Sequence, residues 1–523
     1  MEWWIIGIYI IPTIQYSNNP LIQHSINLHV TEITHGGRNM SFVAELEPQV
    51  VWKHFDEILQ IPRGSKNEEQ MRDYVIGIAQ KHGFSYKQDK TGNLVVRKPA
   101  APGREGAAAI VLQSHLDMVN DKNAEVQHNF ARDAIIPQRD GDYVKATGTT
   151  LGSDNGIGVA SALAIMETRD IAHGPLELLF TIDEETGLTG ASNLAGDLLT
   201  ARHLINLDTE EEGSLYVGCA GGAGSDITLP LKSSKPPKGV VALELKLAGL
   251  HGGHSGVDIH LQRGNATKLL ARALYRAAVE GGFKFRLASI AGGNKHNAIP
   301  REAFATVVLS KKQEKKFTAA LEKLVADIQA EYKTVDPGLQ LTVAPAKAKR
   351  AWDGKSTFKV ISLLHALPHG VMSMSNDIPG LVETSTNLAI VNSGKNKLTL
   401  HCSTRSSVAA ALQATRDRIR AVAEFAGADV KEDDGYPGWK PNLDSKVLKV
   451  SKQVHQELFG VEPAVKAIHA GLECGIIGEK YPGMDMVSMG PQIEFPHSPS
   501  ERVKVNSVGN FYRLLVKTLE RLS

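Results

Sequence analysis

From residue 42 onward, short apolar runs typical of buried strands take turns with longer stretches that have the length of helices. Short apolar runs at 108–114, 176–182 and 203–207 are typical of strands that are buried on both faces of a sheet. The stretch 156–169 consists mainly of small and aliphatic residues and has the length of a helix. Strands that alternate with helices in this way predict an α/β fold with a mostly parallel sheet.

The pattern changes near residue 223, where a second kind of region begins. A turn-like stretch at 233–239 contains two prolines and a glycine, and the segment after it alternates like a strand with one solvated face. Strands are then expected at 240–247, 303–309, 339–343, 386–392 and 397–403, and helices at 265–279, 311–333, 356–366 and 408–425. Because the order of elements recurs, we predict an inserted α+β lid domain at 223–435, built from two tandem β-α-β-β-α units.

The α/β style resumes after the lid region. Helices are expected at 445–459 and 506–522, and strands at 464–468 and 484–489. The simplest organisation is a catalytic domain made of residues 41–222 and 436–523, which the lid domain at 223–435 interrupts.

Residues 1–40 differ from the rest of the chain. They carry few charges and no helical period, and their apolar run at 3–14 is interrupted by Gly7 and Pro12. That run is shorter than the roughly 18 residues of a membrane helix, and Glu2 stands where a secretory signal has basic residues. We interpret residues 1–40 as an extension that is not part of the native fold, and we expect translation of the native protein to start at Met40.

Charge and cysteine content narrow the functional classes. Lys and Arg number 58 and Asp and Glu number 57, and the formal net charge of +1 gives no basic surface for nucleic acid or an anionic membrane. The three cysteines are far apart, which excludes a disulfide framework and a cysteine-based zinc site and favours a reducing compartment. We therefore expect a cytoplasmic protein without nucleic-acid or membrane partners.

Polar residues gather where the predicted strands end. The sequences HLD at 115–117, DEE at 183–185 and NLD at 206–208 follow the three strands, and SDNG at 153–156 opens the helix. Because the carboxyl ends of parallel strands line one edge of a sheet, these groups are expected to share one site. Imidazole and carboxylate ligands without thiolate suit Zn, Mn or Co. A carboxylate such as Asp154 can bridge two such ions.

Each short pattern also has an ordinary alternative. DEETG at 183–187 is typical of a solvated strand-to-helix loop, and NLDTEE at 206–211 is typical of a helix cap. The glycine-rich loop at 152–158 resembles a phosphate-binding turn, but it lacks the lysine of a P-loop. The combination of these patterns at successive strand ends favours one metal site over independent loops.

Five longer sequences give residues 41–523 a family resemblance. They are SHLDMV at 114–119, TTLGSDNG at 149–156, TIDEETG at 181–187, INLDTE at 205–210 and HAGLECG at 469–475. Together they resemble the superfamily of co-catalytic dizinc exopeptidases, which contains dipeptidases, tripeptidases, aminoacylases and glutamate carboxypeptidases. Within that superfamily the chain is similar to the aminoacyl-histidine dipeptidases, which act on Xaa-His dipeptides.

The resemblance implies two divalent metal ions, with zinc favoured over cobalt or manganese. Their ligands would be His115, Asp154, Glu185, Asp208 and His497, with Asp154 bridging the ions. The last of these lies in EFPHSPSE, after the strand that returns from the lid domain. In the family, the peptide bond that follows the bridging aspartate is often cis.

Three further residues would take part in the reaction. Asp117 would accept the second ring N–H of His115 and fix the tautomer of that ring. Glu184 would act as the general base. His254, in GGHSG at 252–256, would stabilise the oxyanion, with His251 and His260 as competitors for this role.

Three residues are candidates for substrate binding. Arg405 matches the position where relatives bind the C-terminal carboxylate of the substrate, which a guanidinium can do through two hydrogen bonds. Asn387 would assist from the neighbouring strand, and Glu473 would hold the free amine. The alternatives are a surface arginine on a strand and a structural loop carboxylate.

The implied function is hydrolysis of a small peptide, an unblocked dipeptide such as Xaa-His, by a metal-bridging hydroxide. A tripeptidase or an N-acyl amino acid hydrolase is the alternative within the superfamily, and a catalytically silent metal-binding protein is the alternative outside it. A serine hydrolase is disfavoured because no G-x-S-x-G elbow stands at a strand–helix junction. Relatives with one β-α-β-β-α unit dimerise and supply the lid histidine across the interface. With two units, this chain is expected to supply His254 itself, and a homodimer stays open.

Overall fold

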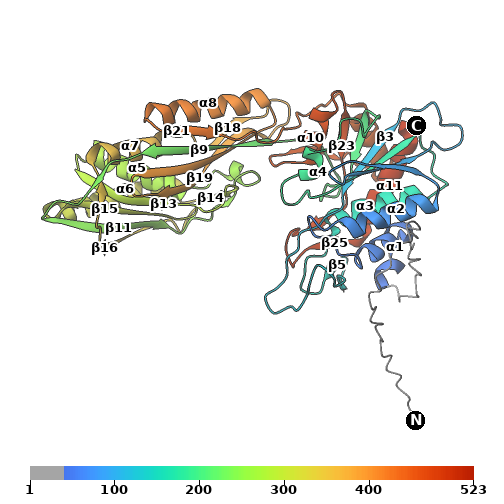
Figure 1. Cartoon of the computed structure of the whole chain (residues 1–523), viewed down its shortest axis with the longest axis horizontal. Coiled ribbons are helices and arrows are strands. Elements are labelled where there is room, and N and C mark those ends of the chain that lie inside the picture. The colour runs from blue at the N-terminus through green and yellow to red at the C-terminus, as the bar shows by residue number, and fades with distance from the viewer. Residues whose placement is uncertain (1–40) are drawn as a thin grey trace, which may run out of the picture. The chain divides into compact units, whose positions relative to one another are not determined.

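The structure is a computed structural model that describes residues 41–523 (Figure 1). The predictions for residues 1–40 fall outside this part of the chain. Two large sheets dominate the described residues, one with eight strands and one with nine, and each has its own hydrophobic core.

The eight-stranded sheet has a parallel centre. Its strand order is β1-β2-β6-β3-β7-β23-β8-β22, in which β6, β3, β7 and β23 run parallel to one another. These strands span Ser85–Gln88 (β1), Leu94–Lys98 (β2), Leu176–Thr181 (β6), Ile110–His115 (β3), His203–Asn206 (β7), Asp485–Ser488 (β23), Ser214–Cys219 (β8) and Ala464–Ile468 (β22). Strands β3 and β6 are buried along their whole length, as their continuous apolar patterns predict. The predicted α/β fold with a mostly parallel sheet is confirmed.

Helices cover both faces of this sheet. The hydrophobic core on one face includes Ile110 and Leu112 of β3, and the core on the other face includes Val111. The first core is formed with α1 (Gln49–Ile58), α2 (Glu69–Lys81), α3 (Ser153–Glu167), α9 (Lys446–Phe459) and α11 (Val505–Leu522), and the second with the short helices α4 (Thr189–Ser192) and α10 (Glu473–Lys480). Within residues 41–523, no helix is long and apolar enough to cross a membrane.

A small four-stranded sheet joins the end of the chain to the start of α3. Its order is β24-β25-β5-β4, with strands at Ile493–Glu494 (β24), Arg502–Lys504 (β25), Tyr143–Ala146 (β5) and Pro137–Asp140 (β4). Strands β24 and β25 pair as a hairpin whose loop contains His497, and β25 also pairs with β5. This sheet therefore brings the C-terminal loop close to the segment that leads into α3.

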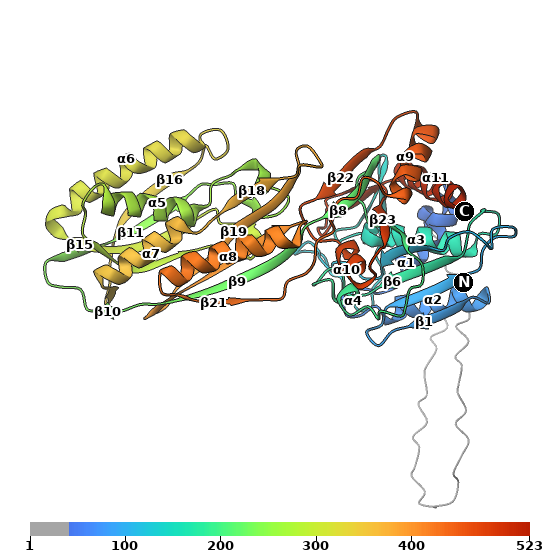
Figure 2. The same ribbon diagram turned by 90° about the horizontal axis from the view of Figure 1, so that it is seen from above.

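The nine-stranded sheet contains two similar units side by side. Its main order is β16-β11-β15-β13-β19-β20-β9-β21, with β18 added beside β19. The strands span Gly221–Pro230 (β9), Val240–Ala248 (β11), Phe285–Gly292 (β13), Ala303–Ser310 (β15), Gln340–Ala346 (β16), Gly370–Met374 (β18), Val382–Ser393 (β19), Lys397–Ser406 (β20) and Asp429–Glu432 (β21). One unit consists of β11, β13, β15 and β16, and the other of β9, β19, β20 and β21. Helices α5 (Ala266–Val279), α6 (Glu314–Tyr332), α7 (Gly354–Ala366) and α8 (Ala409–Phe425) cover one face of this sheet (Figure 2).

The two units are nested along the chain, which corrects the expected tandem order. Strand β9 belongs to the second unit although it precedes the whole first unit. The strand expected at 339–343 is β16, which ends the first unit as an edge strand beside β11 and does not begin the second. The apolar pattern predicts whether a segment is a strand or a helix. It does not predict which strand lies beside which, because a pairing depends on residues far apart in the chain.

The chain passes from one sheet to the other between β8 and β9, at Ala220. It returns beside this crossing, where Tyr436 and Trp439 form backbone bridges with Gly222 and Cys219. A Cβ atom on Gly222 would lie 2.7 Å from the Tyr436 ring, so the two segments can approach this closely only with glycine at this position.

Candidate metal centre

Three neighbouring parallel strands deliver the predicted ligands to one edge of the first sheet. Strand β3 ends at His115. Glu184 and Glu185 come just after the end of β6, and Asp208 comes just after the end of β7. Because β3 lies between β6 and β7, these side chains meet at the carboxyl end of the sheet. The structure therefore brings together the side chains that the sequence placed at the strand ends.

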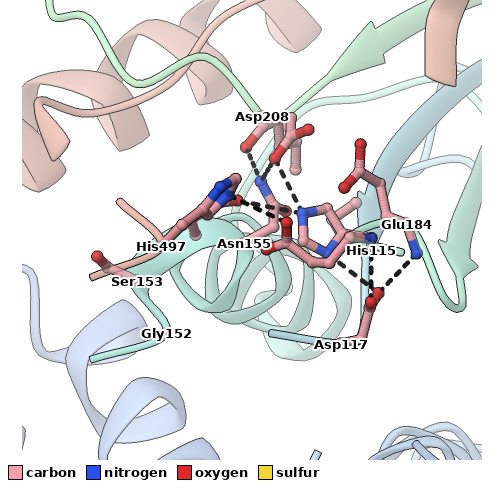
Figure 3. A network of polar contacts seen from close by, with 12 residues as sticks. His115, Asp117, Gly152, Ser153, Asn155, Glu184, Asp208 and His497 are labelled. Atoms are coloured by element: carbon pink, nitrogen blue, oxygen red, sulfur yellow. Dashed lines mark hydrogen bonds and ion pairs between the residues drawn. The ribbon is translucent and has the colours of Figure 1, made fainter. Parts of the chain in front are cut away.

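Asp154 lies at the start of α3, between the imidazole rings of His115 and His497. Figure 3 shows these two histidines with Asn155, the residue that follows Asp154. Its Oδ1 atom is 3.1 Å from Nε2 of His115, and its Oδ2 atom is 3.1 Å from Nε2 of His497. Although burial opposes the effect, the hydrogen bonds from the two histidines lower the pKa of the Asp154 carboxyl. The peptide bond between Asp154 and Asn155 is cis, as the resemblance implies.

Each histidine has a second carboxylate neighbour. The Oδ1 atom of Asp208 is 3.4 Å from Nε2 of His115, and the Oε2 atom of Glu185 is 3.0 Å from Nε2 of His497. Asn155 donates a hydrogen bond to Asp208 and another, of 2.9 Å, to the carbonyl of Leu207. The five residues predicted as metal ligands thus form one continuous group, with the aspartate of α3 at its centre.

The charge balance of this group favours a bound cation. Burial raises the pKa of Glu184, Glu185 and Asp208, and neighbouring carboxylates add to the effect. The Oε1 atom of Glu185 is buried and has no hydrogen-bond partner among the described residues. One ligand atom each of His115, Asp154 and Glu185 lie within 4.8 Å of one another. A donor set of imidazole nitrogen and carboxylate oxygen, with an unpaired buried oxygen, fits a divalent ion of the zinc type.

Asp117 lies behind His115 and connects it to the next strand end. Its Oδ1 atom is 3.3 Å from Nδ1 of His115 and accepts a hydrogen bond of 3.1 Å from the Glu184 backbone N–H. The Oδ2 atom accepts hydrogen bonds from Ser65 Oγ and from the Glu185 backbone N–H. Although burial opposes it, the contact with His115 lowers the pKa of Asp117 to about 2. This carboxylate therefore stays ionised and orients both the histidine and the loop that carries the two glutamates.

The lid histidine belongs to a different group of side chains. His254 lies in the short strand β12 (Gly253–His254), and its Nδ1 atom accepts hydrogen bonds of 3.2 and 3.0 Å from the backbone N–H groups of Gly256 and Val257. Burial and the nearby charge of Arg405 lower the pKa of His254. Among residues 41–523, His254 has no hydrogen bond to any of the predicted metal ligands. The structure thus brings it together with Arg405 and leaves it outside the metal-ligand group.

The competing histidines have other partners. The Nδ1 atom of His251 lies 2.8 Å from the carbonyl oxygen of Val335, and that of His260 lies 2.8 Å from the carbonyl oxygen of Val257.

Arg405 is 8% exposed and lies at the end of β20. Its Nη1 atom donates a hydrogen bond of 2.8 Å to the Tyr436 hydroxyl, and its Nε atom is buried and has no hydrogen-bond partner in residues 41–523. No carboxylate of the described residues forms an ion pair with it. Arg405 lines a cavity of about 670 Å³ together with His296, His401 and Asp433. This cavity lies on the nine-stranded sheet, which we call the lid sheet. A nearly buried guanidinium without a counter-ion among the described residues can bind an anionic ligand.

The two other candidates for substrate binding are partly committed to contacts within the protein. Asn387 donates a hydrogen bond of 2.8 Å to the carbonyl of Ala298, which pairs with His254. The Oε2 atom of Glu473 accepts hydrogen bonds from Gln113 and Thr181, and burial raises the pKa of Glu473 to about 7. Within the described part of the chain, each side chain keeps one buried oxygen without a hydrogen-bond partner, Oδ1 of Asn387 and Oε1 of Glu473.

One acidic residue beside the site was given no role from the sequence. Glu210 lies close to Asp154 and Asp208, and burial beside these carboxylates raises the pKa of Glu210 to about 9. The sequence offered a signal, because Glu210 is part of the INLDTE motif, but the same residues are also typical of a helix cap.

Comparison with known proteins places the chain in a family. Residues 111–521 match peptidase family M20/M25/M40, and the chain belongs to this family. The peptidase superfamily predicted from the sequence motifs is thereby confirmed.

Two relatives align with nearly the whole chain. A cytosol non-specific dipeptidase of Escherichia coli (strain K12) is 42% identical over 484 residues, which cover 92% of this chain and 99% of that protein. The crystal structure of an aminoacylhistidine dipeptidase from Vibrio alginolyticus has a TM-score of 0.86 at 41% identity, covering 92% of this chain and 98% of that one. An aminopeptidase PepT from Bacillus cereus shares the fold, with a TM-score of 0.53 at 18% identity over 91% of this chain and 99% of that one.

Proposed function

We propose that this chain is a dipeptidase that depends on two divalent metal ions, for which zinc best matches the donor set. The observation that carries the proposal is the position of Asp154, whose two carboxylate oxygens face different imidazoles, those of His115 and His497. A carboxylate held in this way can give one oxygen to each of two ions. The similarity to a cytosol non-specific dipeptidase over 92% of the chain supports a dipeptide substrate and a cytoplasmic location.

The five residues of the metal-ligand group would hold the ions, with Glu185 and His497 on one side of Asp154 and His115 and Asp208 on the other. Divalent ions bound there would supply Lewis acidity, which lowers the pKa of water in the site and polarises a peptide carbonyl.

Glu184 would move the proton in this reaction. Its backbone N–H is held by Asp117, while its carboxylate extends away from that contact (Figure 3). The carboxylate has no hydrogen-bond partner in the described part of the chain. Burial and the nearby carboxylate of Asp208 raise the pKa of Glu184, which suits a group that must take a proton from water and give it to the leaving amine near neutral pH.

His254 would donate a hydrogen bond to the oxyanion that develops on the scissile carbonyl. Because the Nδ1 atom of His254 accepts hydrogen bonds from two backbone N–H groups, the neutral ring carries its proton on Nε2. The lowered pKa of His254 keeps the ring neutral, so the Nε2–H group is available as a donor.

Arg405 would bind the C-terminal carboxylate of the dipeptide. Arg405 and Tyr436 line the same cavity, and the Tyr436 hydroxyl is the only hydrogen-bond partner of the guanidinium among the described residues, which leaves the other N–H groups for a carboxylate. Asn387 supports this end of the site by holding the strand that pairs with His254. The free Oε1 atom of Glu473 is the candidate partner of the substrate amine.

A metal-dependence assay on a panel of substrates tests this function. Dialysis against a chelator should abolish hydrolysis of free dipeptides, and added zinc, cobalt or manganese should restore it. The panel should contain Xaa-His and other free dipeptides, the same dipeptides with an acetylated amine, and tripeptides. Full activity of the metal-free protein would contradict metal dependence. Preferred hydrolysis of acetylated dipeptides or of tripeptides would replace the dipeptidase by an N-acyl amino acid hydrolase or a tripeptidase.

A further inference from the structure

Two buried charged residues next to the metal-ligand group have no part in the reaction described above. Arg63 and Glu501 are each 2% exposed, and neither forms an ion pair within residues 41–523. Their charges are opposite, and both contact the same turn, which leads into α3 and carries Asp154. The start of this turn, at Gly152 and Ser153, is seen beside the histidines in Figure 3.

Arg63 connects the turn to the segment that follows β3. Its Nη1 atom donates hydrogen bonds of 3.0 and 2.7 Å to the carbonyl oxygens of Leu116 and Asp117, and its Nη2 atom donates to the carbonyl of Gly152. The backbone carbonyl of Arg63 accepts a further hydrogen bond of 3.1 Å from the N–H of Met118. A planar guanidinium with several donors can reach carbonyls on two segments at once, whereas an ammonium group has no such fork.

The carboxylate of Glu501 binds the backbone N–H groups of the same turn. Its Oε2 atom accepts hydrogen bonds of 2.9 and 3.0 Å from the backbone N–H groups of Leu151 and Gly152. Its Oε1 atom accepts hydrogen bonds from the backbone N–H groups of Ser153, at 2.7 Å, and Asp154, at 3.3 Å, and from the Ser153 hydroxyl at 2.6 Å. A carboxylate is a favourable partner for the N–H groups at the start of a helix.

Glycine makes this double contact possible. Gly152 has a φ angle of 71°, and a Cβ atom on it would lie 2.5 Å from the Arg63 Nη2 atom and 2.7 Å from the Met118 sulfur. A Cβ atom on Gly156 would lie 2.8 Å from the same Nη2 atom. The turn therefore presents its carbonyl to the cation and its N–H groups to the anion, with no side chain in the way.

These contacts link three of the predicted metal ligands. Arg63 fixes the turn of Asp154 relative to the segment just after His115, and Glu501 fixes it relative to the loop that contains His497, four positions earlier in the chain. We propose that Arg63 and Glu501 are positioning residues that hold the Asp154 carboxylate midway between His115 and His497. The proposal rests on the proposed function in one respect, since it takes this carboxylate as the shared metal ligand.

Direct zinc titration tests the proposal without a substrate. In Glu501→Gln, an NH₂ group replaces one oxygen and faces backbone N–H groups, and in Arg63→Met the carbonyls lose their donor. We expect each variant to bind zinc about 10- to 100-fold more weakly than the unmodified protein, in calorimetry or in competition with a chromophoric chelator. For dipeptide hydrolysis at saturating zinc, kcat should fall while KM changes little, because the substrate contacts are untouched.

Two matched variants control for a merely structural effect. Lys98 is also a buried cation that donates to carbonyls of α3, at Ile165 and Thr168, but at the opposite end of the helix. Glu177 is also a buried carboxylate and accepts hydrogen bonds from the backbone N–H groups of Thr200 and Ala201, but it lies at the amino end of β6, opposite to the end that carries the site. We expect Lys98→Met and Glu177→Gln to lower the unfolding temperature and to leave zinc affinity and kcat unchanged.

Conservative variants keep the test informative when a variant folds poorly. Arg63→Lys restores the charge and one donor group and should recover part of the zinc affinity, and Glu501→Asp should do the same at the anionic side. Unchanged zinc affinity in both Arg63→Met and Glu501→Gln, or an equal loss in the two control variants, would overturn the proposal. Because zinc alone is the probe, this result stands apart from the dipeptidase function, which fails separately if the unmodified protein binds zinc but hydrolyses no dipeptide.

Discussion

The Oδ2 atom of Asp154 lies 3.1 Å from the Nε2 atom of His497, although the two residues are 343 positions apart in the sequence. The lid sheet occupies much of the interval between them. Contact is made through the β24–β25 hairpin, which pairs with β5 just before the turn of Asp154. The proposed metal site is therefore completed only when the C-terminal part of the chain has folded against the N-terminal part.

Substitutions of the adjacent residues Glu184 and Glu185 should have different effects on metal binding and on turnover, because the two side chains have different surroundings. Glu185 contacts His497 and belongs to the metal-ligand group, whereas Glu184 has no side-chain partner in the described residues. We expect Glu184→Gln to retain both metal ions and to lower kcat by about 100-fold or more, since the proton carrier is lost. Metal analysis by mass spectrometry and steady-state kinetics on the same preparation measure both quantities.

The neighbouring substitution is the matched control for this prediction. Glu185→Gln should lose zinc affinity, and its activity should recover in part when zinc is added in excess. Near-normal turnover of Glu184→Gln would remove that residue as the general base, and loss of metal from it would assign it to the ligand group.

The fold of the first sheet and the gathering of polar residues at its strand ends were predictable because both leave local signals in the sequence. Strands β3 and β6 are continuous apolar runs, and His115, Glu185 and Asp208 stand directly at or after strand ends. The position of His497 could be inferred only from a family resemblance, since a loop histidine has no pattern of its own. Its contact with Asp154 depends on pairing between β25 and β5, which the apolar pattern does not encode.

The segment that follows His254 contacts His469, which follows β22 of the eight-stranded sheet in the same chain, and this favours catalysis without a partner subunit. The Oγ atom of Ser385 on β19 is 2.7 Å from Nε2 of His469, and a Cβ atom on Gly256, two positions after His254, would meet the backbone carbonyl of His469. We expect a mixture of His254→Ala and Glu184→Ala proteins to show no more activity than the two variants assayed alone. Activity restored by mixing would show instead that the histidine acts across a dimer interface.

Arg405 should determine affinity for substrates with a free C-terminal carboxylate. Arg405→Met removes the only charged partner that we assign to that carboxylate, so we expect KM for dipeptides to rise by about 30-fold or more. Dipeptide amides lack the carboxylate and provide the control substrate, for which the variant and the unmodified protein should differ little. Equal losses on dipeptides and on their amides would assign the arginine a structural role beside Tyr436.

Contacts made through backbone groups were beyond the reach of the sequence. Arg63 and Glu501 bind carbonyl and N–H groups of the turn before Asp154, and backbone groups are the same at every position of a chain. Nesting of the two lid units is hidden for a related reason, because β9 and β20 pair across more than 150 intervening residues without any shared motif. Residue type predicts which groups can bind a metal, but Arg63 and Glu501, which hold the turn of Asp154 through backbone groups, are found only in three dimensions.

His469 should make the stability of the metal-free protein depend on pH. Its ring is buried next to Ser385 of the nine-stranded sheet, and burial together with the nearby charges of Arg405 and His254 lowers the pKa of His469 to about 3. The unfolded chain takes up a proton near pH 6.5, whereas the folded protein keeps this ring neutral, so folding stability is lost as the pH falls from about 6.5 toward 3.

At pH 5 this histidine should cost about 1–2 kcal/mol of unfolding free energy relative to pH 7, given roughly 1.4 kcal/mol for each unit between the two pKa values. Denaturant unfolding in the presence of a chelator measures the difference. His469→Gln can keep a hydrogen bond with Ser385 but cannot titrate, so its stability should fall less over this interval than that of the unmodified protein. His260→Gln changes an exposed ring and is the control, which should follow the unmodified protein. Parallel curves for all three proteins would show that His469 is not held neutral by the fold.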